Sequence, residues 1–349
     1  MVDRFILGSV AERLNLREYG LTYTVVGLAV VLALPVVLDT YYTGILIDAM
    51  VLITFATGFN LLFGYTGLLS FGHAAFFGAG AYSVAILSQQ LGFVNSLVPA
   101  IVLAIIVTAV VAGVIGVLSV QQSDIFFAML TLAFNLMLYQ GAVQFSNISG
   151  GESGLLVEAT TVNLGLFTFP TSNNMLYYYF TFAIMALSLV VIWRITRSPY
   201  GDLLVAIREN PDRAQFIGVP VKRYQWSAFV ISGAIGGLAG ALAAPRRFVI
   251  TPSIMHWSAS ADPVLMTILG GPAVFFGPAA GAILFVTLEQ ILTNITEHWY
   301  LGLGAILVTI VLFLPQGLVG TVVKSSDRTV VEMATRAVDP RQHEEDSGE

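Results

Sequence analysis

The chain has 349 residues, of which 56% are hydrophobic and only 10% are charged, with a formal net charge of −6. These proportions exclude a soluble globular domain, which carries about a quarter charged residues, and a nucleic-acid-binding protein, which is basic. The absence of cysteine excludes disulfides, thiolate metal sites and a cysteine nucleophile. We therefore expect an all-α polytopic membrane protein with about eight to ten membrane segments, some broken or re-entrant, each span taking roughly 20 residues.

Apolar stretches follow one another along the first half of the chain. Residues 1–20 are predicted to be a cytoplasmic or interfacial segment, and residues 21–195 are predicted to hold membrane segments. The predicted spans are 21–38, 44–63, 99–120, 126–145 and 177–193, with a polar loop over 146–174. Residues 64–83 differ because five glycines and a histidine interrupt the apolar run, which predicts a broken or tightly packed segment inside the protein.

A polar segment, Arg194 to Arg223, separates the two halves and holds six of the fifteen Lys and Arg. Ser198 and Pro199 predict the start of a short helix because they are typical N-cap and first-turn residues. Its predicted apolar face consists of Leu203, Ala206 and Ile207.

Asn210-Pro211 ends this helix, and a second one is predicted to run on to Gly218, a glycine typical of a helix C-terminus. Its apolar residues are Ala214, Phe216 and Ile217. A loop that is basic only because it faces the cytoplasm would need neither caps nor apolar faces. The pattern therefore favours a docking surface over residues 196–224.

Residues 225–318 are predicted to return the chain to the membrane. The span 226–244 is studded with small residues, which is typical of close helix packing. Residues 263–292 are too long for one span and too short for two, and the sequence GGPAVFFGP at 270–278 interrupts them, which predicts two part-helices meeting at a bend. The last span is predicted at 301–314, followed by a mobile acidic tail over 319–349.

The basic residues predict the orientation. Thirteen of the fifteen lie in the N-terminal segment, the polar segment and the tail. The positive-inside rule places all three in the cytoplasm, so both termini are expected there. Arg246 and Arg247 are then expected on the opposite side, meeting either an external partner or lipid phosphates.

Few residues indicate chemistry within the chain. No Walker A sequence is present, and the four histidines lack metal-ligand spacing, so we expect no catalytic site, no metal site and no cofactor bound by this chain. Asp48 and Glu289 lie within apolar sequence, where a carboxylate is either functional or hydrated near an interface. His73 is interpreted as a packed histidine rather than a proton relay.

Several long stretches, in this order, resemble one family: the permease subunits of branched-chain amino-acid ABC importers, in particular the M-type half of the H/M permease pair. The resemblance covers about residues 44–320. Its most specific parts are NLLFGYTGLLSFGHAAFFGAGAY (60–82), FFAMLTLAF (126–134), ISGGESGL (148–155), SPYGDLLVAIRENPDRAQFIGV (198–219), the glycine-rich span through Gly240, and ILGGPAVFFGPAAGA (268–282).

The resemblance implies roles for two sets of residues. The polar segment would be the ATPase-coupling loop, similar to the EAA loop of ABC importers, and it would use Gly201, Ala206, Arg208, Glu209, Asn210, Asp212, Arg213, Ala214 and Gly218. A possible translocation pathway with helix breaks would involve Asn60, Gly64, Thr66, Gly67, Ser70, His73, Gly270, Gly271 and Gly277.

The implied protein is a permease subunit in the cell membrane that forms half of a pathway for branched-chain or related amino acids. Its implied partners are a second, homologous permease, two ATP-binding subunits that carry ATP and Mg²⁺, an extracytoplasmic solute-binding protein and membrane lipid. Two alternatives remain open at this point. One is an ATP-independent secondary transporter or channel for a small polar solute, and the other is an importer of urea or short amides.

Overall fold

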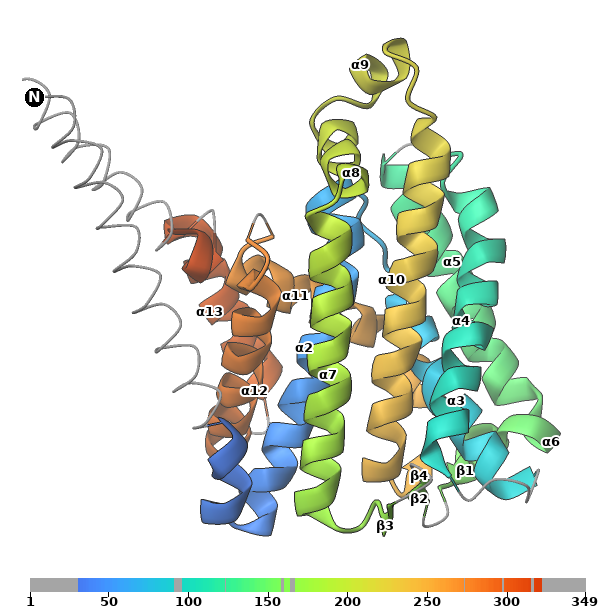
Figure 1. Cartoon of the computed structure of the whole chain (residues 1–349), viewed down its shortest axis with the longest axis vertical. Coiled ribbons are helices and arrows are strands. Elements are labelled where there is room, and N and C mark those ends of the chain that lie inside the picture. The colour runs from blue at the N-terminus through green and yellow to red at the C-terminus, as the bar shows by residue number, and fades with distance from the viewer. Residues whose placement is uncertain are drawn as a thin grey trace, which may run out of the picture.

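A computed structural model describes residues 31–90, 96–122, 124–157, 160–163, 167–272, 274–296, 298–314 and 317–321. Among them, six helices are long and apolar enough to cross a membrane, and α3, α11 and α13 are shorter (Figure 1). The expected all-α polytopic architecture is confirmed. The segment 1–20, most of the predicted span 21–38 and nearly all of the predicted tail lie outside the described residues.

The first half of the chain follows the predicted spans closely. Its helices are α2 (Thr40–Thr66), α3 (His73–Gln90), α4 (Leu97–Ser119), α5 (Asp124–Gln144), α6 (Ser146–Ser149), the 3-10 helix η1 (Gly151–Ser153) and α7 (Asn174–Thr196). Strands β1 (Leu155–Leu156), β2 (Thr161–Asn163) and β3 (Thr168–Pro170) lie in the loop between α6 and α7. The glycine-rich stretch is broken as expected, because 67–72 is non-helical between α2 and α3.

The second half begins with two short helices and returns to the bundle. It contains α8 (Pro199–Glu209), α9 (Pro211–Phe216), α10 (Val221–Ala243), η2 (Ala244–Arg246), β4 (Val249–Ile250), η3 (Pro252–Met255), η4 (Trp257–Ser260), α11 (Ala261–Gly270), α12 (Gly277–Ile295) and α13 (Trp299–Phe313). The predicted bend is confirmed by the break between α11 and α12, but only α11 is a part-helix, since α12 is long and apolar enough to cross a membrane. Strand β4 pairs antiparallel with β1, and β2 pairs antiparallel with β3.

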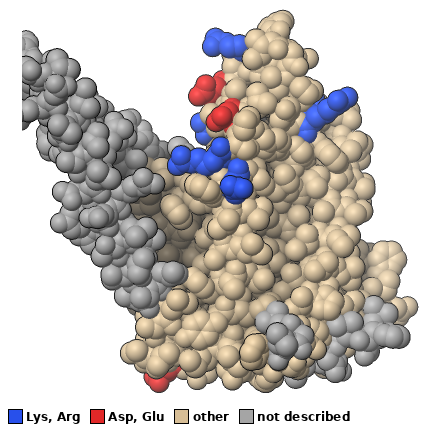
Figure 2. All heavy atoms as spheres, viewed as in Figure 1, with Lys and Arg blue, Asp and Glu red and all other residues tan. Residues whose placement is uncertain are grey.

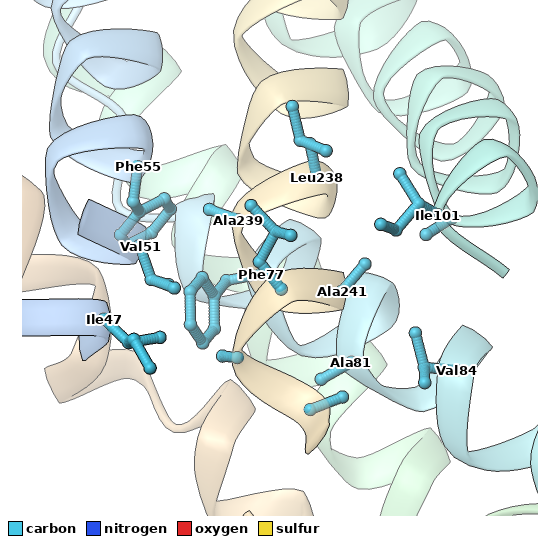
Figure 3. Packing of buried hydrophobic residues seen from close by; sticks show 14 of the residues in the cluster. Ile47, Val51, Phe55, Phe77, Ala81, Val84, Ile101, Leu238, Ala239 and Ala241 are labelled. Atoms are coloured by element: carbon cyan, nitrogen blue, oxygen red, sulfur yellow. The ribbon is translucent and has the colours of Figure 1, made fainter. Parts of the chain in front are cut away.

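Helix α10 lies at the centre of the bundle, between α2, α3 and α4 (Figures 1 and 3). Its glycines allow backbone contact: a Cβ on Gly240 would overlap the carbonyl oxygen of Phe77, and one on Gly237 would overlap Thr108. Around these contacts, Phe55, Phe77 and their apolar neighbours form the main buried cluster. The small residues of this span therefore pack as the sequence predicts.

The two ends of the bundle differ in charge. We call the end that carries α8 and α9 the basic end, because the Lys and Arg visible on this face gather there (Figure 2). We call the opposite end, with β1 to β4, the strand end (Figure 1). The distribution of Lys and Arg agrees with the orientation predicted from the positive-inside rule, which places the basic end in the cytoplasm.

Two irregular segments are partly buried against the helices of the bundle. The first is 67–72, and the second runs from 247 through η3 and η4 to α11. Side chains of the neighbouring helix α5 satisfy backbone groups of both segments: Thr131 Oγ1 accepts from the Phe71 amide at 3.2 Å, and the Asn135 side chain donates to the Met255 carbonyl at 3.0 Å. Irregular backbone at membrane depth requires such partners.

Candidate functional site

The two short helices at the basic end begin at the residues that the sequence indicates. Helix α8 begins at Pro199 after Ser198, and α9 begins at Pro211 after Asn210. The Asn210 side chain accepts from the Arg213 amide at 2.8 Å, which caps α9. Gly218 has φ +92°, a conformation that favours glycine, and it turns the chain towards α10. The predicted bend between the two helices is therefore present.

The buried faces of these helices differ from the prediction. In α8, the buried residues are Gly201, Leu204 and Ile207, whereas Ala206 is exposed. In α9, only Ala214 is buried, while Phe216 is 90% exposed and Ile217 is 75% exposed. The remaining predicted loop residues are all exposed: Arg208, Glu209, Asn210, Asp212, Arg213 and Gly218. The tip of the loop thus presents apolar side chains that no other described part of the chain covers.

Arg208 connects the short helices to the membrane bundle. Its guanidinium Nη1 donates to the Gly64 carbonyl in the last turn of α2. A Cβ on Gly64 would also lie 2.5 Å from the Pro272 carbonyl, in the bend between α11 and α12. Three separate segments of the chain, α8, the end of α2 and this bend, therefore meet at the basic end.

The predicted pathway residues of the first break lie together but are tightly packed. The side chains of Asn60, Thr66, Ser70 and His73 are all buried. The His73 ring makes a 2.8 Å hydrogen bond to Ser232 of α10 and meets three phenylalanine rings edge-on. His73 is thus a packed, hydrogen-bonded histidine, as interpreted from the sequence. Gly67 ends α2 beside Arg208, since its added Cβ would touch the Arg208 side chain at 3.1 Å.

The predicted residues of the second break form a backbone-to-backbone contact. A Cβ on Gly270 would overlap the Gly277 carbonyl, and one on Gly277 would overlap the Gly271 carbonyl. Gly271 itself has φ +107° and ends α11. These three glycines form the close backbone contact at the bend between α11 and α12.

Charged residues gather at the strand end, where the sequence had indicated only Asp48, Glu289 and the arginine pair. Arg246 Nη2 lies 3.3 Å from Asp48 Oδ2, which joins η2 to α2. Arg247, Asp262 and Glu289 line a cavity of about 290 Å³ between α2, α3, η3, η4, α11 and α12. Asp262 was not identified from the sequence as a candidate site residue. It could have been found as a carboxylate at the start of an apolar helix, opposite in charge to the nearby Arg246 and Arg247.

A metal centre finds no support in the described part of the chain. No group of three or more His, Asp or Glu comes together there in a way that would hold an ion. A bundle of long apolar helices with broken helices in its interior is the architecture of a multi-pass membrane transport protein.

Comparison with family models identifies the family of membrane transport proteins to which the chain belongs. Residues 41–314 match the family described as branched-chain amino acid transport system / permease component. The chain therefore belongs to this family and is a multi-pass protein of the inner membrane. The membership confirms the resemblance seen in the sequence.

Three curated relatives are permease proteins named LivM. The high-affinity branched-chain amino acid transport system permease protein of Salmonella typhimurium is 28% identical over 83% of this chain and 73% of its own length. The protein of the same description from Escherichia coli is also 28% identical, over 77% of this chain and 68% of its own. A probable branched-chain amino acid transport permease of Methanocaldococcus jannaschii is 22% identical over 82% and 84%. No solved structure matches the chain.

Proposed function

We propose that this chain is the permease subunit of an ATP-driven importer of branched-chain amino acids and forms half of the translocation pathway. Family membership and the named relatives support the substrate class. A second, homologous permease would complete the pathway, and an extracytoplasmic binding protein would deliver the amino acid at the strand end. The chain would bind no nucleotide itself, since ATP and Mg²⁺ would be held by two partner subunits.

The observation that carries this proposal is the pair of short helices at the basic end. The exposed Phe216 and Ile217 offer an apolar contact, while Arg208 ties the same unit to the end of α2. Closure of the ATP-binding subunits on ATP would move α8 and α9 as one lever. The lever would act on α2 and on the α11–α12 bend, which lie against each other, and so switch access between the two ends.

Purification of the tagged chain from its native membrane tests the assembly. We expect two ATP-binding subunits and a second permease to accompany it, and the complex to take up labelled leucine only with ATP. Phe216→Asp should reduce recovery of the ATP-binding subunits on the order of tenfold, because it places a charge in an apolar contact. Phe248→Asp is the matched control, since Phe248 is 82% exposed at the strand end.

Two outcomes would overturn the proposal. The first is recovery of the chain alone, with uptake that follows an ion gradient after ATP is depleted, which would make it a secondary transporter. The second is uptake of urea or a short amide with no response to leucine, which would reassign the substrate and leave the assembly standing.

Arg208→Ala should separate ATP hydrolysis from transport. The variant loses the charge-assisted hydrogen bond to Gly64, which is worth about 1.5–3 kcal/mol, so uptake should fall roughly tenfold or more while hydrolysis continues. Uptake and hydrolysis are measured together in proteoliposomes that contain the complete complex. Arg194→Ala is the control, because Arg194 is exposed in the last turn of α7. Equal loss of both activities in Arg208→Ala would contradict a coupling role.

A further inference from the structure

The cavity at the strand end combines charged and apolar walls. Arg247, Asp262 and Glu289 supply one guanidinium and two carboxylates, and Ser253 and Ser258 add hydroxyls. Apolar residues complete the lining and include Phe55 and Phe77, whose ring centroids lie 4.9 Å apart (Figure 3). The volume of about 290 Å³ is at the lower limit for small-ligand sites, which suits a ligand of few atoms.

The three charged side chains have no fixed partners. Within the described ranges the one ion pair joins Arg246 to Asp48, and no hydrogen bond is formed by the side chains of Arg247, Asp262 or Glu289. Asp262 and Glu289 are half-buried, and Arg247 is exposed. A carboxylate that is partly withdrawn from water without a partner is costly, so a cationic group beside Asp262 and Glu289 would be favoured, and the exposed Arg247 offers a counter-charge for an anionic group.

The position of the cavity also fits transit. Arg247 and Glu289 lie towards the strand end, since Arg247 follows α10 and Glu289 lies in the last third of α12. Its inner wall includes Ala74, the second residue of α3. The 18 residues of α3 span about 27 Å at 1.5 Å per residue, and Ala74 lies at the start of this helix, far from the strand end. The cavity therefore extends from the strand end well into the interior of the bundle. Beyond it, a second buried apolar cluster that includes Leu61, Phe76 and Phe229 fills the bundle on the side of the basic end.

We propose that this cavity receives the imported amino acid as a zwitterion, an inference that rests on the proposed function. Asp262 and Glu289 attract its ammonium group, Arg247 attracts its carboxylate, and the branched side chain lies against Phe55, Phe77 and Ile254. No covalent step is involved. Because none of the charges is prearranged in an ion pair, the ligand is held by partly hydrated contacts and leaves readily.

Cysteine protection tests occupancy directly, since the chain contains no cysteine of its own. Ser258→Cys places a thiol on the cavity wall, and labelling of this chain by a methanethiosulfonate reagent is followed in membranes that contain the complete complex. Leucine should slow the labelling on the order of tenfold, whereas leucinamide, which lacks the carboxylate, and 4-methylpentanoate, which lacks the ammonium, should protect far less. Thr168→Cys, exposed in β3 outside the cavity, should be labelled equally with and without leucine.

Charge removal supplies the second measurement. Asp262→Asn and Glu289→Gln should each abolish leucine protection of Ser258→Cys and lower leucine uptake roughly tenfold, while ATP hydrolysis and recovery of the partner subunits stay unchanged. Equal protection by leucine and by both analogues would overturn the inference, and so would unchanged uptake in both variants. In either case the wild-type complex still imports leucine, whereas failure of the proposed function itself would appear as a wild-type complex without leucine uptake.

Discussion

Gly218→Arg is expected to abolish transport while leaving the chain inserted in the membrane. Gly218 has φ +92°, so any side chain there strains the backbone by about 1–3 kcal/mol, and arginine adds a long charged group beside Phe216 and Ile217. No described atom lies within 4 Å of an added Cβ, so the side chain meets no neighbour within the chain. Its effect would fall on the docking of the ATP-binding subunits, measured as ATP-dependent leucine uptake at matched membrane levels.

Gly218→Asn is the matched control, because asparagine tolerates a positive φ better than other residues with a side chain. It should retain most of the uptake. Wild-type uptake by Gly218→Arg would contradict a docking role for the loop. Loss of the protein from the membrane would indicate that the loop acts in folding instead.

Gly270→Val should prevent the chain from reaching its native fold. The valine Cβ would overlap the Gly277 carbonyl and lie 3.0 Å from the Gly281 amide nitrogen, so α11 and α12 must move apart. Overpacking of this kind costs about 3 kcal/mol or more. The expected result is a marked loss of folded monomer after detergent extraction, measured by size-exclusion chromatography and by the thermal unfolding midpoint.

Gly304→Val is its control, since Gly304 lies in α13 with nothing described within 4 Å of an added Cβ. This variant should accumulate like the wild type. If Gly270→Val is equally abundant and equally stable, the backbone contact between α11 and α12 is not needed for folding.

The helices themselves could be predicted because lipid and core impose strong local rules. Long apolar stretches gave α2, α4, α5, α7 and α10 to within a few residues at most ends, and glycine and proline marked the break at 270–278. These signals are local: hydropathy, capping and helix-breaking residues each act within one or two turns. The stretches that resemble the permease family fall in the same segments and in the same order along the chain.

The site was harder to predict because its residues are brought together by tertiary packing. The buried face of α8 was misplaced by a fraction of a turn, since Leu204 rather than Ala206 lies inwards, and each position on a helix turns by about 100°. Phe216 and Ile217 are apolar like core residues, yet no residue that the structure describes covers them. Arg247 precedes β4, Asp262 lies in α11 and Glu289 in α12, so the three residues are distant in sequence and meet only because the segment between α10 and α11 folds back against the bundle.

The contact between Arg208 and Gly64 has an electrostatic consequence for the resting state. The carbonyls in the last turn of α2 form the negative end of a helix dipole, and α2 itself has no basic residue there. Arg208 supplies that positive charge from α8, an interaction worth about 0.3–1 kcal/mol at an exposed site. Pulling α8 away would leave the dipole uncompensated, so the contact stabilises the position of α8 against the end of α2. In the proposed ATP-driven cycle, this attraction would oppose movement of α8 away from α2 and would favour the return of the two helices to the arrangement described here.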